Sequence, residues 1–348
     1  MFRIKKTIVC KDIHEYQVNE ALVTTYTPVA GDVALFEVGE IGRHRNIQAD
    51  DKRSVPIMPG DLIIAAFADR YATSQFEGYV PTEPMSTVHI LSAGGAIGIV
   101  RTKNSSLDDV EPTNVHLVGY LTDPNGKIIN TKFRETPQIA FRGELPNNAK
   151  VMLSIGSTMD SGKTTTAAHL ARGLKYTGKT VAFIKLTGTC FTKDKDYVYD
   201  LGADISIDFS DAGFASTYMS GESEILDLYQ TLLDKLAPYQ PEYIVMEIAD
   251  GLMQRETEFL LNNKAFMKTV YNVVFSCGDS LAALQGLKML DEMGIEPAAI
   301  SGRFTMSPLL IQEVHSRSGI PTYTIDQLMT GECNDTFIHE SVLHKQMV

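Results

Sequence analysis

Residues 151–166 read VMLSIGSTMDSGKTTT, and this stretch decides the fold of the C-terminal half of the chain. The apolar run at 151–155 predicts a buried strand. A loop of small and polar residues follows, and Gly162, Lys163 and Thr164 open a predicted helix that extends to residue 176. A strand, a tight loop and a helix N-terminus in this order direct backbone N–H groups toward an anion. The stretch therefore predicts a phosphate-binding loop.

Each part of this loop has a predicted function in holding a nucleotide. Lys163 is expected to reach the β and γ phosphates, and the Thr164 hydroxyl is expected to bind Mg²⁺. The usual pattern G-x-x-x-x-G-K-[ST] has glycine where this chain has Ser157, and the glycine lies one residue earlier, at Gly156. The loop is therefore a variant. The residues expected to contact the nucleotide are Ser157, Thr158, Met159, Asp160, Ser161, Gly162, Lys163, Thr164 and Thr165.

Predicted strands and helices alternate throughout the rest of this half. The strands are expected at 180–186, 243–248, 270–276, 298–301 and 322–325, and the helices at 222–236, 280–293 and 308–318. Alternation of this kind predicts an α/β fold, a mainly parallel sheet with helices on both faces. Ligands of such folds bind where the carboxyl ends of the strands meet.

The first 148 residues have a different pattern. Short β-rich runs, among them 33–38, 62–67 and 96–100, are separated by Gly, Pro and Asp turns. This pattern predicts a small all-β domain, either a barrel or a sandwich. The polar, turn-rich segment 143–148 indicates the boundary, so the predicted domains are 1–148 and 149–348. The polar and aromatic cluster at 69–78 is expected to be a domain-interface loop, and a ligand loop is the alternative.

The loop resembles that of dethiobiotin synthetase and the related cobyrinic and cobyric acid amide-forming enzymes, in which glycine, five residues and then Gly-Lys-Thr follow one another. The resemblance covers residues 151–326. It implies that Asp160, three positions before the lysine, helps to hold Mg²⁺. It also implies that Lys185, which lies near the end of the predicted strand 180–186, is a catalytic cation. A lysine that extends into solvent is the alternative.

The predicted strand 243–248 ends in acidic residues. In the enzymes that the loop resembles, this strand ends in Glu-Gly-Ala-Gly-Gly. Glu247 and Gly251 match that pattern, whereas Ile248 and Asp250 depart from it. Glu247 is expected to act in catalysis and to bind Mg²⁺, because an acid between apolar residues is costly to bury without a metal or a lysine partner.

Four further residues are candidates with two interpretations each. Asp200 and Asp208 come from an Asp-rich stretch that could complete a metal site or form a solvated surface. Arg303 follows a predicted strand and is expected to contact the nucleotide, with a surface ion pair as the alternative. His169, on the helix after the loop, is expected to be a packed helix residue rather than a base.

The composition limits the classes of function. The chain has 348 residues and a formal net charge of −12, which disfavours a large nucleic-acid footprint. Its four cysteines are far apart and indicate neither a zinc site nor a disulfide framework. We expect no signal peptide and no membrane helix, and therefore a cytoplasmic protein.

These features predict an enzyme that uses Mg²⁺ and ATP to phosphorylate or activate a small-molecule substrate, with Lys163, Lys185 and Glu247 as catalytic residues. The alternative is a nucleotide-dependent switch, or an NTPase that delivers a cofactor or metal, with 187–213 as switch segments. ATP is favoured over GTP because a guanine-reading Asn-Lys-x-Asp motif is absent from the predicted strand ends. A polynucleotide kinase is disfavoured by the acidic charge. The resemblance also implies a homodimer.

Overall fold

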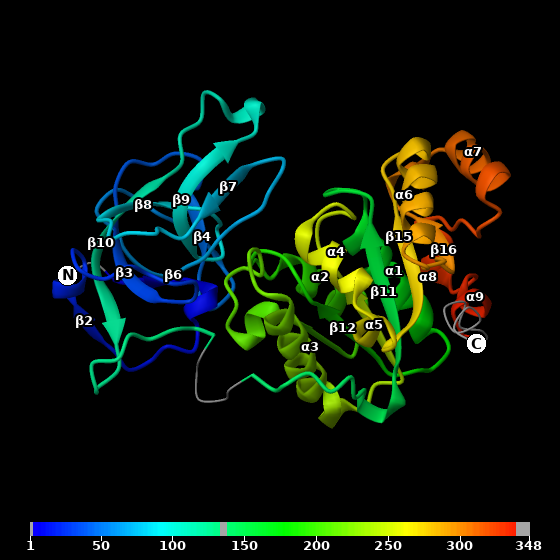
Figure 1. The fold of residues 1–348 in the computed structure, drawn as a ribbon, viewed down its shortest axis with the longest axis horizontal. Helices are drawn as coiled ribbons and strands as arrows, with labels where there is room; N and C mark the ends of the chain where they lie inside the picture. Colours follow the sequence, from blue (N-terminus) through cyan, green and yellow to red (C-terminus); the bar gives the residue numbers. More distant parts are fainter. Residues whose placement is uncertain (1–2, 133–137, 339–348) are drawn as a thin grey trace. The chain divides into compact units, whose positions relative to one another are not determined.

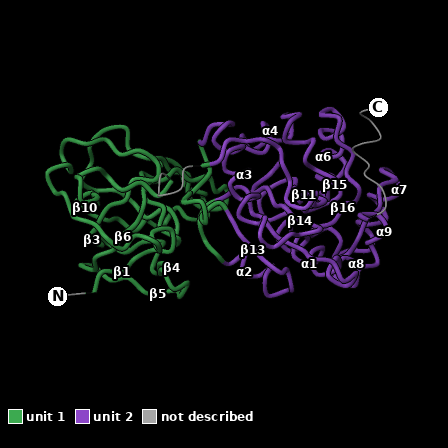
Figure 2. Tube along the Cα trace, turned by 90° about the horizontal axis from the view of Figure 1, so that it is seen from below, with its two compact units in different colours: residues 1–138, 189–192, 209–219 green, residues 139–188, 193–208, 220–348 purple. Residues whose placement is uncertain are grey.

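The computed structural model describes residues 3–132 and 138–338. They form two compact units, which Figure 2 shows in different colours. Unit 1 contains residues 1–138 with the segments 189–192 and 209–219, and unit 2 contains 139–188, 193–208 and 220–348. Both segments follow the predicted boundary at residue 148 in sequence. The chain therefore leaves unit 2 and returns to it twice.

Unit 1 is an all-β unit built on one sheet (Figure 1). Within the described residues its strands pair in the order β1 (Lys5–Lys6), β6 (Leu62–Phe67), β3 (Val33–Val38), β10 (Asn114–Thr122), β8 (Thr87–Ile90), β9 (Ala96–Lys103) and β7 (Phe76–Tyr79). β2 (Gln17–Asn19) pairs with β10, and β4 (Asn46–Gln48) forms a separate pair with β5 (Ser54–Pro56). Short 3₁₀ turns are η1 (Ile8–Cys10), η2 (Glu20–Leu22), η3 (Ser105–Leu107) and η5 (Phe209–Ala212).

A closing contact makes this sheet a barrel rather than a sandwich. β6 pairs with β3 on one side and with β9 on the other, where Ala66 is opposite Ala96. β6, β3, β10, β8 and β9 therefore form a closed ring. Aromatic side chains fill its core: Phe67 stacks on Tyr120 at 5.9 Å and meets Phe36 edge-on at 5.5 Å. Of the two predicted architectures, the barrel is the one observed.

Unit 2 contains a parallel sheet that is six strands wide within the described residues. Every pairing in it is parallel, so the carboxyl ends of all its strands lie at one edge. Ser154, Glu247, Lys185 and Asp208 are successive register partners near that edge. The strand order is β13 (Ile205–Asp208), β12 (Val181–Lys185), β14 (Tyr243–Glu247), β11 (Lys150–Gly156), β15 (Val270–Ser276) and β16 (Ala299–Ser301).

Helices cover both faces of this sheet (Figure 2). On one face lie α1 (Lys163–Lys175), α2 (Lys193–Asp200), α8 (Ile325–Thr330) and α9 (Asn334–Ile338), whose apolar residues share a buried core with β11, β12, β14 and β15. On the other face lie α3 (Glu222–Leu236), α4 (Arg255–Asn262), α5 (Lys264–Met267) and α6 (Ser280–Glu292). α7 (Pro308–Ser318) follows β16, and η4 (Pro146–Asn148), η6 (Ala237–Tyr239) and η7 (Arg303–Met306) are short turns.

Two parts of unit 2 differ from the sequence prediction. The predicted strand 322–325 is an isolated bridge between Thr322 and Ile300, because a capping box of Thr324 and Gln327 starts α8 at Ile325 instead. The Asp-rich stretch contains a helix, α2, and an edge strand, β13, where no regular element was predicted.

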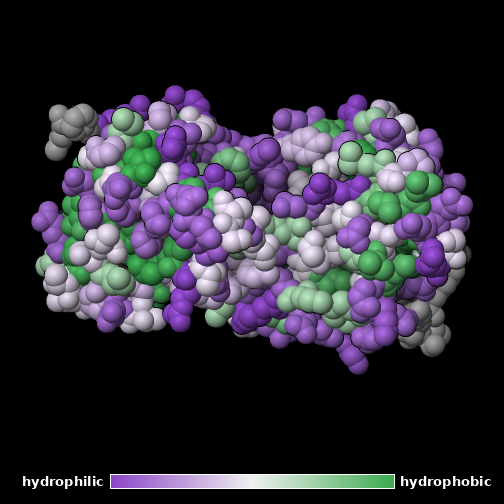
Figure 3. All heavy atoms as spheres, turned by 90° about the horizontal axis from the view of Figure 1, so that it is seen from above, coloured by the Kyte–Doolittle hydropathy of each residue, from purple (hydrophilic) through white to green (hydrophobic). Residues whose placement is uncertain are grey.

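The outer surface has no continuous apolar band on the face that Figure 3 shows, where hydrophilic and apolar residues are interspersed. None of the helices in the described part of the chain is both long enough and apolar enough to cross a membrane.

Candidate nucleotide-binding site

The loop between β11 and α1 lies at the carboxyl edge of the parallel sheet. Asp160 and Gly162 have left-handed backbone conformations there, with φ of 62° and 103°. A Cβ atom on Gly156 would come within 2.2 Å of Ser161 Oγ and 2.7 Å of the Lys163 side chain. A side chain at 156 would therefore have to displace Ser161 or Lys163, so close packing favours glycine at this position.

Residues at or just after the ends of β14, β15 and β16 contact the phosphate loop. The Ser157 N–H donates to the Ser276 carbonyl at 2.9 Å, and the Arg303 N–H donates to the Ser161 carbonyl at 3.1 Å. After β14, Gly251 packs so closely that a Cβ would lie 2.5 Å from the Ser157 carbonyl oxygen. The loop is thus fixed from several sides, as preorganised binding of a ligand requires.

Lys163 spans the loop. Lys163 is 6% exposed, and its ammonium group donates a hydrogen bond to the Thr158 carbonyl at 2.8 Å. Burial lowers the pKa of Lys163, and the nearby carboxylates of Glu247 and Asp250 oppose that effect. The ammonium group of Lys163 therefore lies against the backbone of the loop.

Glu247 and Thr164 are in contact. The Thr164 hydroxyl donates to Glu247 Oε1 at 3.1 Å, and Lys185 Nζ lies 3.4 Å from the same oxygen. Glu247 is 1% exposed, and its other oxygen, Oε2, has no hydrogen-bond partner within the described residues. A buried carboxylate oxygen without a partner is costly, and a cation or an ordered water would satisfy it.

Lys185 is a fixed cation rather than a lysine extending into solvent. Its side chain is 13% exposed and forms ion pairs with Glu247 and with Asp194, the second residue of α2. Burial by itself lowers the pKa of Lys185, but Glu247 and Asp194 outweigh burial and raise it. Lys185 is therefore charged at neutral pH. Asp194 was not identified from the sequence, because the pairing depends on the course of α2.

Asp250 also belongs to this site, although sequence analysis had not selected it. Its φ of 65° is left-handed, and it occupies a position where the resembled enzymes have glycine. Aspartate is among the few residues that adopt this conformation readily. Burial raises the pKa of Asp250 to about 6, although Lys163 and Lys185 act to lower it. In the sequence, the acidic residue at a glycine position of the resembled pattern is the feature that could have indicated Asp250 as a site residue.

Two predicted residues do not join this group through their side chains. Asp160 is exposed at the loop and, within the described residues, makes no hydrogen bond or ion pair with Thr164 or Glu247. Arg303 contributes its backbone N–H, while its side chain is exposed. No group of three or more His, Cys, Asp and Glu side chains in the described part of the chain is arranged to hold a metal. Thr164 and Glu247, two of the residues predicted to bind Mg²⁺, are in direct contact with each other.

The other candidates have structural contacts. Asp208 is buried in an ion pair with Lys195 at 3.0 Å, and Asp200 is exposed at the end of α2. His169 contacts the Thr165 carbonyl at 2.7 Å on its own helix, as expected for a packed helix residue. All four cysteines are buried thiols outside any disulfide.

These features together define a class. The central strand of a parallel sheet leads into a Gly-Lys-Thr loop and a helix, and an adjacent strand ends in an acid that contacts the threonine of the loop. Unit 2 therefore has a P-loop nucleotide-binding fold.

Comparison with known proteins adds similarities in structure. No family model matches the chain, and no curated protein matches it. It is similar to the signal recognition particle receptor FtsY from Elizabethkingia anophelis in complex with GDP, at 15% identity over 59% of this chain and 68% of that one, with a TM-score of 0.39. It is also similar to the signal recognition particle 54 kDa protein from Aeropyrum pernix K1 in complex with GDP, at 16% identity over 61% of this chain and 50% of that one, with a TM-score of 0.38.

A third similar structure is the cell division protein FtsY from Thermotoga maritima, at 13% identity over 60% of this chain and 74% of that one, with a TM-score of 0.37. At such scores the similarity carries no argument about function. None of these three structures is a dethiobiotin synthetase-like enzyme, so that resemblance stays a prediction.

Proposed function

We propose that unit 2 binds a nucleoside triphosphate with Mg²⁺, and that the chain is a nucleotide-dependent switch whose state reaches unit 1. The observation that carries the switch is the course of the chain after β12 and β13. Each strand ends at the nucleotide edge of the sheet, and the chain then passes directly into a segment of unit 1.

The loop supports triphosphate binding. Thr166 makes the first hydrogen bond of α1, to the Gly162 carbonyl at 2.9 Å. The preceding N–H groups, those of Lys163, Thr164 and Thr165, belong to the helix end that has no acceptor within the helix, and they are available to phosphate oxygens. Lys163 would exchange the Thr158 carbonyl for a phosphate oxygen, which is a more favourable partner for an ammonium group.

The acidic group supports Mg²⁺ and hydrolysis. The hydroxyl of Thr164 and the unpartnered Oε2 of Glu247 are oxygen ligands of the kind that Mg²⁺ prefers. They would bind the ion directly or through a bridging water. When bound, Mg²⁺ would neutralise charge on the β and γ phosphates. Glu247 would orient the attacking water, and Lys185 would stabilise the charge that develops on the γ-phosphoryl oxygens.

The switch rests on two short connections. β12 ends at Lys185, and the segment 189–192 of unit 1 begins four residues later. Within unit 1 the Gln48 side chain donates to Thr192 Oγ1 at 2.7 Å and accepts from the Thr192 N–H at 3.0 Å. If Lys185 changed position on loss of the γ-phosphate, segment 189–192 would shift with it. This segment is hydrogen-bonded to the barrel through Gln48 and Thr192. Ordered and released switch segments of this kind are a common form of nucleotide response.

Transfer of the γ-phosphoryl group to a small-molecule substrate is the second candidate. Lys185 supports it, because two carboxylates fix this cation where the resemblance to dethiobiotin synthetase implies a catalytic lysine. In that case hydrolysis without substrate would be slow. Comparison of ATP with GTP in binding and hydrolysis identifies the base, adenine or guanine.

Hydrogen exchange with phosphate-release kinetics tests the proposal. Exchange at 187–192 and 209–219 should differ between a non-hydrolysable triphosphate analogue and the diphosphate, for either ATP or GTP. Lys163→Ala should abolish the difference, while Lys175→Ala, at the far end of α1 in an exposed ion pair with Asp204, should retain it. Identical exchange in both nucleotide states, with turnover that depends on an added substrate, would replace the switch by the transferase.

A further inference from the structure

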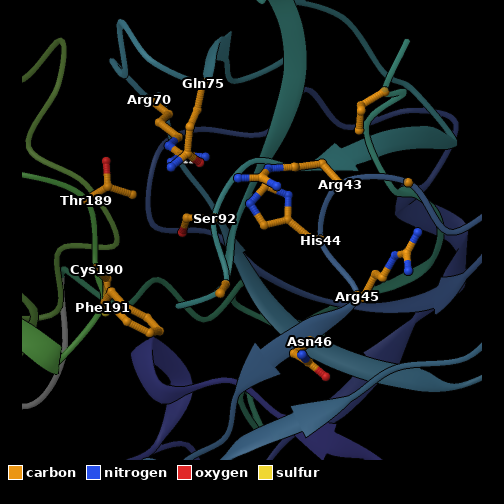
Figure 4. Close-up of a pocket in the computed structure, with 13 residues that line it drawn as sticks. Arg43, His44, Arg45, Asn46, Arg70, Gln75, Ser92, Thr189, Cys190 and Phe191 are labelled. Carbon is orange, nitrogen blue, oxygen red and sulfur yellow. Dashed lines mark hydrogen bonds between the residues drawn. The ribbon is translucent and has the colours of Figure 1, made fainter. Parts of the chain in front are cut away.

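Unit 1 contains a cavity of about 650 Å³ outside the nucleotide site (Figure 4). The loop before β4, the loop between β6 and β7, the β8–β9 turn and the segment 189–191 all contribute to its wall. Cavities of this volume are typical of small-molecule sites. The polar residues that line the cavity include Arg43, His44, Arg70, Gln75, Ser92 and Thr189.

The charge of this cavity is opposite to that of the protein. The chain has a formal charge of −12, yet no Asp or Glu is among the residues that line the cavity. Figure 4 shows the guanidinium groups of Arg43 and Arg70 directed toward the same space, with Arg45 pointing away from it. Arg43 is exposed and forms no ion pair with any residue that the structure describes. A concave site that is lined by arginine and has no acidic residue in its lining attracts anions.

The fold holds the second arginine firmly. Arg70 is 8% exposed, and its guanidinium donates to Gln75 Oε1 at 2.8 Å and to the Leu91 carbonyl. Its backbone exchanges two hydrogen bonds with Gly78, at 2.8 and 3.1 Å. A guanidinium held in this way loses little further side-chain entropy when an anion binds beside it.

His44 lies beside the arginines in the lining of the cavity and is uncharged at neutral pH. The ring of His44 packs edge-on against Phe76 at 6.0 Å, and its Nδ1 is a buried atom without a hydrogen-bond partner in the described part of the chain. Burial, followed by the charges of Arg70 and Arg43, lowers the pKa of His44 to about 3. His44 is therefore neutral at physiological pH, and the arginines supply the positive charge of the cavity.

We propose that this cavity binds a small organic anion, with Arg43 and Arg70 contacting its carboxylate or phosphoryl oxygens and the hydroxyls of Ser92 and Thr189 contacting its polar remainder. Arginine suits both oxyanions because its planar fork donates two parallel hydrogen bonds. The site is independent of the nucleotide proposal.

A single tryptophan can report on this cavity, because the chain contains none. Phe191, which lines the cavity and is 43% exposed, is the position for Phe191→Trp. The variant, with Lys163→Ala to remove phosphate binding at the loop, is titrated with inorganic phosphate, with citrate and with sodium chloride at matched ionic strength. Saturable fluorescence changes with phosphate or citrate, but not with chloride, are expected. Binding of phosphate indicates a site for a phosphoryl group, and binding of citrate indicates a site for carboxylates.

Substitution of the exposed arginine tests the location. Arg43→Gln should weaken anion binding by about tenfold, which corresponds to 1.4 kcal/mol. Arg53→Gln removes another exposed arginine of unit 1, paired with Asp51, and should leave the affinity unchanged. Calorimetric titration of the wild type and of Arg43→Gln with citrate repeats the comparison without the reporter. No saturable binding of either anion, or equal affinity in Arg43→Gln and wild type, would overturn the proposal whether or not a nucleotide binds unit 2.

Discussion

Glu247 is 1% exposed, and its two carboxylate oxygens have different surroundings. Oε1 accepts a hydrogen bond from Thr164 and faces Lys185, whereas Oε2 has no partner within the described residues. The register of the sheet explains the group, because Lys185 and Glu247 are direct partners on β12 and β14. A parallel sheet thus brings together side chains that are 62 positions apart, and here they meet beside the phosphate loop.

Glu247→Gln keeps the shape of this side chain and removes its charge. We expect nucleotide hydrolysis to fall by at least about a hundredfold and the Mg²⁺ dependence of nucleotide affinity to weaken. Glu242→Gln, which lies one residue before β14 in an exposed pair with Lys179, is the matched control. Hydrolysis at the wild-type rate in Glu247→Gln would remove this carboxylate from the mechanism.

Asp250 makes stability depend on pH in a defined direction. Burial raises its pKa from 3.8 to about 6, so the folded protein keeps a proton that the unfolded chain releases within this window. The free energy of unfolding therefore falls as the pH rises through the window, and the loss persists above it. Asp250→Asn, which tolerates the left-handed backbone, should be more stable than wild type above pH 6, by on the order of 1 kcal/mol after allowance for its partial exposure.

Urea unfolding of both proteins at pH 5 to 8 measures this effect. The difference between Asp250→Asn and wild type should grow with pH. A constant difference across that range would show that the carboxyl of Asp250 is already ionised throughout.

Among the elements, the phosphate loop depends most on a single glycine. Gly156→Ala would place a Cβ 2.2 Å from Ser161 Oγ and 2.7 Å from the Lys163 side chain, so the loop would have to move. We expect the free energy of unfolding to fall by about 1–3 kcal/mol and nucleotide affinity to fall with it. Gly221→Ala faces open space at a φ of −71° and serves as the control in the same two assays. Undiminished affinity in Gly156→Ala would contradict the packing argument.

Elements with clear apolar runs could be predicted from the sequence. The predicted bounds of β3, β6, β15, α3 and α7 agree with the structure, because each run ends at a turn or a cap. α2 and β13 could not be predicted, because their residues are polar and their pairing is tertiary. The sequence placed Lys185 at the carboxyl edge of the sheet and indicated that Glu247 needs a metal or a lysine partner. The pairing of these two residues, the contact with Asp194 and the cavity around Arg43 and Arg70 required the structure.

For the whole molecule, the two excursions of the chain into unit 1 are the basis of the switch. Gln48 holds the first of them, segment 189–192, because its buried amide forms two hydrogen bonds with Thr192. Gln48→Ala removes both hydrogen bonds between this side chain and Thr192, which should lower the free energy of unfolding by about 1–3 kcal/mol. It should also remove any nucleotide-dependent change in hydrogen exchange at β4 while nucleotide affinity persists. Gln17→Ala, on an exposed position of β2, should change neither property.

If β4 of Gln48→Ala responds to nucleotide as it does in the wild type, the state of the nucleotide reaches the barrel by another route. Lys11 and Asp211, which form a hydrogen bond at 2.9 Å in the second excursion, would then be the next pair to substitute.

The most direct test of the central claim is thermal unfolding of wild type and Lys163→Ala with Mg²⁺ and ATP, GTP or neither. A nucleotide that binds only the folded state stabilises it by RT ln(1 + [L]/Kd), about 2.7 kcal/mol at a hundredfold excess over Kd. The structure predicts a rise of several degrees in Tm for wild type with at least one triphosphate, and loss of that rise in Lys163→Ala. Well-folded wild type that shows no rise with either triphosphate would contradict nucleotide binding by unit 2.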